Sequence, residues 1–121
     1  MREIKFRAWD KYNHRWLDLF QLAFAKDGSV MAVNTLDGET YGLHQVDIVE
    51  WTGLKDKNGK EIYEGDIVSL GDINKVHYKG VIEMVKGCWC ARVNERLTPI
   101  IAKWIVEVIG DIYSNPELLE K

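Results

Sequence analysis

Residues 51–68 read WTGLKDKNGKEIYEGDIV, and the rest of the chain is organised around this stretch. The segment 56–59 (DKNG) is a strong turn signal, because Asn and Gly both tolerate a positive φ and favour a type I′ hairpin turn. Residues 60–63 are too short for a helix, and a second break at 64–66 leads into the apolar pair 67–68. The stretch predicts a hairpin turn, a short extended piece, a second turn and a buried strand.

Upstream of this stretch, the pattern predicts a meander of short strands. Residues 2–9 alternate, with Ile4, Phe6 and Ala8 on one face of the strand. The Asp-Gly pair at 27–28 separates two apolar runs, which is typical of a hairpin turn, and the pair at 37–38 predicts a loop or a second tight turn. The segment 46–51 reads as the strand that enters the central stretch.

Downstream, further strands are expected at 76–85, 88–93, 104–109 and 112–113. Gly80 suggests a bulge or a bend in the first of these, and Pro99 indicates a sheet edge. Residues 114–119 (SNPELL) predict a short C-terminal helix, since Asn can cap a helix and Pro suits its first position.

We therefore expect a mainly β (β-rich α+β) protein with one domain spanning residues 1–121. Its sub-regions are an antiparallel N-terminal meander, 1–50, packed on a small SH3-like barrel with a short terminal helix, 51–121. The SH3-like assignment rests on the Gly-Asp-Ile-Val strand entry at 65–68, an analogy of fold that does not indicate function.

Composition excludes several classes of protein. Hydrophobic residues make up 46% of the chain, which is ordinary for a globular protein. The formal net charge of −3 argues against non-specific binding to phosphate backbones as the main activity. No apolar run is long enough for a transmembrane helix, and the charged N-terminus is unlike a signal peptide. We expect a cytoplasmic protein whose two cysteines are free thiols.

Three blocks of the sequence resemble the YopX family of phage and prophage proteins. Residues 52–68 (TGLKDKNGKEIYEGDIV) are similar to the family's hallmark, 1–10 (MREIKFRAWD) to its opening and 107–119 (EVIGDIYSNPELL) to its ending. Trp51 stands where a Tyr is expected, and 69–103 matches nothing we can name. The resemblance implies a small intracellular protein of phage or mobile origin without an established activity, so no catalytic residue is carried over.

Two constellations invite a metal hypothesis, and both fall short. Cys88 and Cys90 would share one strand face near His77, whereas zinc takes four ligands that are usually supplied as paired knuckles. A calcium loop at 56–61 lacks its first acid, because Leu54 stands there. His14, His44 and His77 have no nucleophile motif nearby. We expect no catalytic residue, no metal and no cofactor.

One basic patch contains interleaved aromatic residues. Lys55, Lys57 and Lys60 lie close in sequence to Trp51 and Tyr63, a combination that can bind nucleic acid by charge and base stacking. Neighbouring acids dilute its field. Weak nucleic-acid binding is therefore an alternative function and not the favoured one.

The tryptophan content favours protein interaction. Five Trp residues among 121 exceed what a small core can place centrally, and Trp9 falls on the polar face of its strand. An aromatic residue outside a sheet often marks an interface, and short meanders leave sheet edges open. We expect a non-enzymatic module that pairs with itself as a homo-oligomer, and also binds a host or phage protein. An enzyme of unrecognised type is a further alternative.

Overall fold

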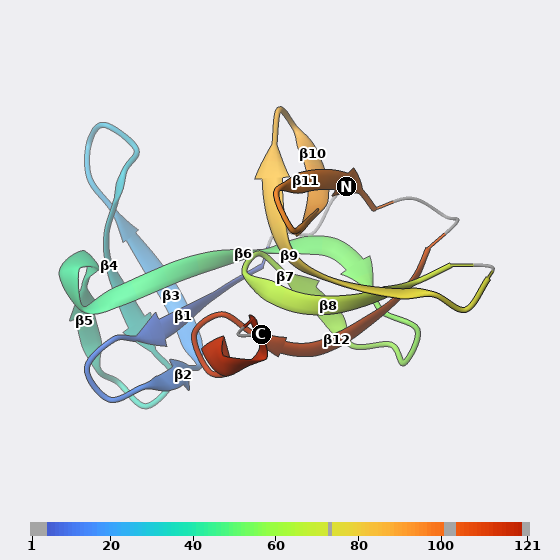
Figure 1. Ribbon diagram of the computed structural model, residues 1–121. Coiled ribbons are helices and arrows are strands. Elements are labelled where there is room, and N and C mark those ends of the chain that lie inside the picture. The colour runs from blue at the N-terminus through green and yellow to red at the C-terminus, as the bar shows by residue number, and fades with distance from the viewer. Residues whose placement is uncertain (1–4, 73, 101–103, 120–121) are drawn as a thin grey trace. The chain divides into compact units, whose positions relative to one another are not determined.

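A computed structural model describes residues 5–72, 74–100 and 104–119. These residues divide into two compact units, Lys5–Glu50 and the chain from Trp51 onward (Figure 1). No helix in the described ranges has the length and apolar character to cross a membrane. Each unit is mainly β and is described by itself.

The first unit contains five complete strands, one 3-10 turn and the beginning of a sixth strand. They are β1 (Phe6–Asp10), β2 (Arg15–Leu17), β3 (Leu19–Phe24), β4 (Val30–Thr35), β5 (Thr40–Gly42), η1 (Leu43–Gln45) and β6 (Val46–Lys55). β1 pairs antiparallel with β2 and with the first half of β6, while β3, β4 and β5 form a separate antiparallel sheet. The buried core consists of Ala8, Leu17, Val33, Tyr41 and Val46.

The second unit is a half-barrel of five antiparallel strands in the order β11-β10-β9-β8-β12. The strands are β8 (Asp66–Gly71), β9 (His77–Val85), β10 (Cys88–Val93), β11 (Arg96–Pro99) and β12 (Ile105–Asp111). The second half of β6 pairs with the short strand β7 (Glu61–Tyr63). Its buried core consists of Ile62, Val68, Leu70, Ile82, Ala91 and Val106.

Several predicted turns are confirmed, because glycine supplies the positive φ that they need. Gly28 and Gly38 have φ values of 88° and 90°, and they lie between β3 and β4 and between β4 and β5. The hairpin at 56–59 joins β6 to β7, as expected. Pro99 ends β11, which is an edge strand of its sheet.

The predicted type I′ turn at 56–59 is wrong. Among the described residues of this turn only Gly59 has a positive φ, 83°, and Asn58 does not. The Gly59 N–H donates to the Asp56 carbonyl at 3.0 Å, the pattern of a type I turn followed by a left-handed glycine. The Asp56 carboxylate accepts hydrogen bonds from the N–H groups of Asn58 and Lys60, at 2.8 and 2.9 Å. These hydrogen bonds to the Asp56 side chain stabilise the observed turn.

Expectations for the C-terminal half also need correction. Gly80 pairs with Val68 in unbroken register, so of the expected bulge or bend the bulge is wrong. A register shift lies instead between Val108 and Gly110. Residues 112–113 turn and do not form a strand, because the Asp111 carboxylate accepts the N–H groups of residues 113 and 114. The chain end forms a 3-10 turn, η2 (Pro116–Leu119), so neither an α-helix nor an SH3-like barrel is confirmed.

Candidate functional site

The aromatic residues of the predicted basic patch come together. Trp51 and Tyr63 lie directly opposite each other in the β6–β7 pair, and both are half-buried. The Trp51 indole N–H donates to the Leu54 carbonyl at 3.1 Å, which orients its ring. The structure thus brings together the two aromatic side chains that the sequence singled out.

The lysines of the same patch face carboxylates. Lys55 lies opposite Glu61 in the β6–β7 pair. Lys57 Nζ lies 3.6 Å from a carboxylate oxygen of Glu107 on β12. The positive charge of Lys60 helps to lower the pKa of the buried Asp56 carboxyl in the same turn. The surface is of mixed charge, and a role in nucleic-acid binding stays a prediction.

Trp9 is placed differently from our expectation. Its side chain is only 7% exposed, and its ring packs edge to face on Trp16 with centroids 5.1 Å apart. The Trp16 ring also receives the Arg7 guanidinium, 3.9 Å from its centroid. The expectation that Trp9 lies on an exposed polar face is therefore wrong, and its binding role stays a prediction.

The two cysteines lie far along the sheet from His77. Cys88 pairs with Val85 at the opposite end of β9 from His77, so the expected proximity is wrong. Cys88 is exposed and Cys90 is buried, and burial raises the pKa of the Cys90 thiol. In the described ranges, no three His, Cys, Asp or Glu side chains gather as metal ligands would.

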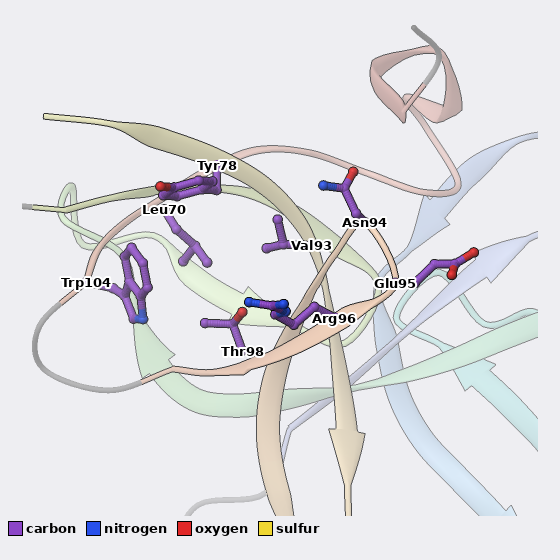
Figure 2. A pocket seen from close by; sticks show the side chains of 8 residues that line it. All are labelled: Leu70, Tyr78, Val93, Asn94, Glu95, Arg96, Thr98 and Trp104. Carbon is purple, nitrogen blue, oxygen red and sulfur yellow. The ribbon is translucent and has the colours of Figure 1, made fainter.

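The second unit contains a pocket of about 680 Å3, which we call the Trp104 pocket (Figure 2). Its lining residues come from β8, β9, β10, β11, the β10–β11 turn and the residue before β12: Leu70, Tyr78, Val93, Asn94, Glu95, Arg96, Thr98 and Trp104. Tyr78 and Trp104 form its aromatic side, with ring centroids 5.9 Å apart and ring planes at 85°. Edge-to-face packing of this kind is favourable for aromatic pairs.

Strand register explains why these residues meet. Leu70 pairs with Tyr78 on the neighbouring strand, so both side chains lie on one face of the sheet. Val93 pairs with Arg96, and Thr98 follows Arg96 by two positions on the edge strand β11. Side chains alternate along a strand, so Arg96 and Thr98 point to the same face as Val93. The pocket lies on this face.

Polar groups of the pocket differ in their orientation. Figure 2 shows the Arg96 guanidinium reaching toward Thr98 and Trp104, whereas the Glu95 carboxylate points away from them. Within the described part of the chain, the Arg96 side chain has no hydrogen bond or ion pair. Arg92, one strand away, forms a two-point pair with Glu83 at 2.7 and 2.9 Å. The pocket therefore holds an uncommitted guanidinium beside two aromatic rings.

The edge strand β3 of the first unit has the sequence LFQLAF and carries no charge. Phe20 and Phe24 on this strand are 69% and 59% exposed. Edge strands of monomeric proteins are usually protected by charged residues or proline, as β11 is by Arg96 and Pro99. Two register shifts in the β3–β4 pair bend the edge without adding charge to it.

Neither the Trp104 pocket nor the β3 edge was among the sites predicted from sequence. The absence of charge from 19–25 was a usable signal for β3, because an edge strand without charge is uncommon. The pocket had no local signal, since its lining residues come from four separate stretches of the sequence.

Comparisons with known proteins agree with the fold. The profile of the YopX protein family matches residues 5–120. The crystal structure of protein EF1440 from Enterococcus faecalis superposes with a TM-score of 0.76 and 28% sequence identity, covering 99% of this chain and all of that one. The crystal structure of protein yopX from Bacillus subtilis gives a TM-score of 0.70 at 21% identity, with the same coverage. No curated protein matches the sequence. This chain belongs to the YopX protein family.

Proposed function

We propose that this protein is a non-enzymatic interaction module of phage or prophage origin that forms homo-oligomers in the host cytoplasm. The observation that carries the proposal is the uncharged edge strand β3 with its two exposed phenylalanines. An SH3-like scaffold for the second unit, and a host or phage protein as a further partner, belong to the same proposal.

Pairing of β3 with β3 of a second copy explains both features of the strand. Antiparallel pairing about a two-fold axis supplies hydrogen-bond partners to the backbone edges of both copies. The same contact removes Phe20 and Phe24 from water, and burying a phenylalanine side chain contributes about 1.5–3 kcal/mol. A strand without charge has no repulsion to oppose this pairing.

Nucleic-acid binding has less support from the geometry. Carboxylates face the lysines of the 55–60 turn and reduce the local positive potential that phosphate binding needs. The measurement proposed for oligomerisation also tests this alternative, because a bound oligonucleotide adds mass at low salt.

The double substitution Phe20→Lys/Phe24→Lys is expected to convert the protein to a 14.0 kDa monomer. Two lysines per copy place four like charges along the proposed contact and remove its apolar surface. Light scattering at several salt concentrations, with and without a short oligonucleotide, measures the mass. The unmodified protein should show a fixed multiple of 14.0 kDa that salt does not alter.

Ile105→Lys is the matched control. Ile105 is 57% exposed and starts β12, an edge strand of the other unit. The substitution therefore also replaces an exposed apolar side chain on an edge strand by lysine, but outside the proposed contact. This variant should keep the mass of the unmodified protein. A monomeric unmodified protein, or a double variant that retains its mass, would contradict the proposal.

A further inference from the structure

We propose that the Trp104 pocket is a binding site for a ligand that carries one flat apolar ring and one carboxylate. This inference goes beyond the proposed function and does not depend on oligomerisation through β3. It rests on the composition of the pocket lining, on the orientation of Arg96 and on the lack of a hydrogen bond or ion pair from its guanidinium to any described residue.

The ring is assigned from the apolar part of the lining. Tyr78 and Trp104 present aromatic surface, and Leu70 and Val93 add aliphatic surface beside them. Aromatic side chains attract a further ring by stacked or edge-to-face contact. A volume of about 680 Å3 lies within the range of small-molecule sites, so a single ring with a short substituent fits.

The carboxylate is assigned from Arg96. It is the single cationic residue of the described lining, and its guanidinium reaches toward the aromatic side of the pocket. A guanidinium presents paired donors that match the two oxygens of a carboxylate. The Thr98 hydroxyl and the Asn94 amide are further donors on the same lining.

The number of charges decides between a carboxylate and a phosphate. One guanidinium neutralises a single negative charge, whereas a phosphate monoester at pH 7 carries nearly two. The Glu95 carboxylate points away from the aromatic side of the pocket, so it does not neutralise the positive charge of Arg96 there. The described lining has no second cation that could neutralise a second negative charge on a ligand. A monoanion is therefore the ligand that leaves no charge uncompensated.

Binding of N-acetyl-phenylalanine to the full chain tests the proposal. It supplies the ring and the carboxylate, and its amide, N-acetyl-phenylalaninamide, supplies the ring alone. In a two-dimensional NMR titration, the acid should shift the backbone resonances of Tyr78, Arg96 and Thr98 and saturate with a Kd of about 1 mM or below. The amide should bind about 10- to 100-fold more weakly, because it lacks the charged hydrogen bonds.

Two variants and a control locate the contacts. Arg96→Gln should reduce the affinity for the acid to that for the amide. Arg92→Gln removes a positive charge from the neighbouring strand, where the Arg92 guanidinium is already paired with Glu83. This variant should leave the affinity for the acid unchanged. Tyr78→Leu should weaken the acid and the amide alike, because both use the ring contact.

The source of the carboxylate is distinguished by the tripeptide Ala-Ala-Phe with a free C-terminus. If the tripeptide binds more tightly than N-acetyl-phenylalanine, the proposal is supported and the carboxylate is that of a protein chain end. If the two bind equally, the proposal is supported and the ligand is a free aromatic acid. Equal affinity for acid and amide, equal effects of Arg96→Gln and Arg92→Gln, tighter binding of adenosine monophosphate, or no saturable shift would each overturn it.

Discussion

Asp56→Ala is expected to lower the free energy of unfolding by about 2–4 kcal/mol. Asp56 is buried, with 8% of the residue exposed, and one of its carboxylate oxygens accepts the N–H groups of Asn58 and Lys60. The other oxygen accepts the Val108 N–H on β12 at 2.9 Å. Alanine leaves these donors without their acceptor, and a buried donor without a partner costs about 1–3 kcal/mol. Urea unfolding followed by tryptophan fluorescence measures the change.

Asp72→Ala is the control for this substitution. Asp72 makes the same local bonds in its own turn, accepting the N–H groups of Asn74 and Val76 at 2.9 and 3.0 Å, but those bonds are exposed and reach no other strand. The expected loss is about 0.5–1.5 kcal/mol. Equal losses in the two variants would show that the bond from Asp56 to Val108 contributes nothing.

Acid should remove the contribution of Asp56. Burial acts to raise the pKa of its carboxyl, but hydrogen bonds from three backbone N–H groups and the charge of Lys60 outweigh burial and hold the pKa below its ordinary value. The carboxyl of an unfolded aspartate titrates near pH 4, so the stabilisation is complete above that pH and is lost as the pH falls through the lower folded pKa. Unfolding measured between pH 7 and pH 3 should show a smaller acid-induced loss in Asp56→Ala than in the unmodified protein.

Gly80→Ala is expected to lower the free energy of unfolding by about 1–3 kcal/mol. A β-carbon on Gly80 would lie 3.0 Å from the Ala91 Cβ and 3.0 Å from the Val93 Cγ2, and 3.3 Å from the Arg92 carbonyl oxygen. Ala91 is fully buried in the core of the half-barrel, and backbone and short side chains cannot move aside easily. Thermal or urea unfolding measures the loss.

Gly71→Ala is the contrasting substitution for Gly80→Ala. A β-carbon there also meets an atom at 3.0 Å, but that atom belongs to the ring of His77, whose side chain is exposed and can rotate away. Both glycines lie in strands and lack a positive φ. Gly71→Ala should change stability by less than about 0.5 kcal/mol. If the two variants were equally stable, the close contacts of Gly80 with Ala91 and Val93 would not be the cause of a loss of stability.

Local signals predicted much of the strand and turn pattern. The Asp-Gly pairs at 27–28 and 37–38 lie in turns whose geometry depends on a few neighbouring residues, so sequence alone located them. The turn type at 56–59 could not be predicted from the Asn-Gly pair, because the Asp56 carboxylate holds the backbone of the turn and also a strand 52 positions away. Gly80 was interpreted as a bulge or a bend because its sequence does not show how closely Ala91 and Val93 on the paired strand β10 approach it.

Contacts between distant residues explain what sequence missed in the candidate site. The Trp104 pocket combines residues of four strands, of one turn and of the position before β12, and no spacing in the sequence links Tyr78 to Trp104. Trp9 was expected to be exposed because its strand alternates, but its ring packs on Trp16 from the paired strand. Periodicity predicts which side chains share a face, and only the partner strands determine which faces are covered.

The antiparallel pairing of β8 with β12 has a consequence for folding during synthesis. β12 leaves the ribosome after the other described strands, and it supplies a neighbour for β8 as well as the N–H that reaches Asp56. The half-barrel therefore cannot be completed before residues 105–111 have emerged. The first unit has its strand pairs and its core within Lys5–Glu50, so we expect it to fold while the second unit is still being translated.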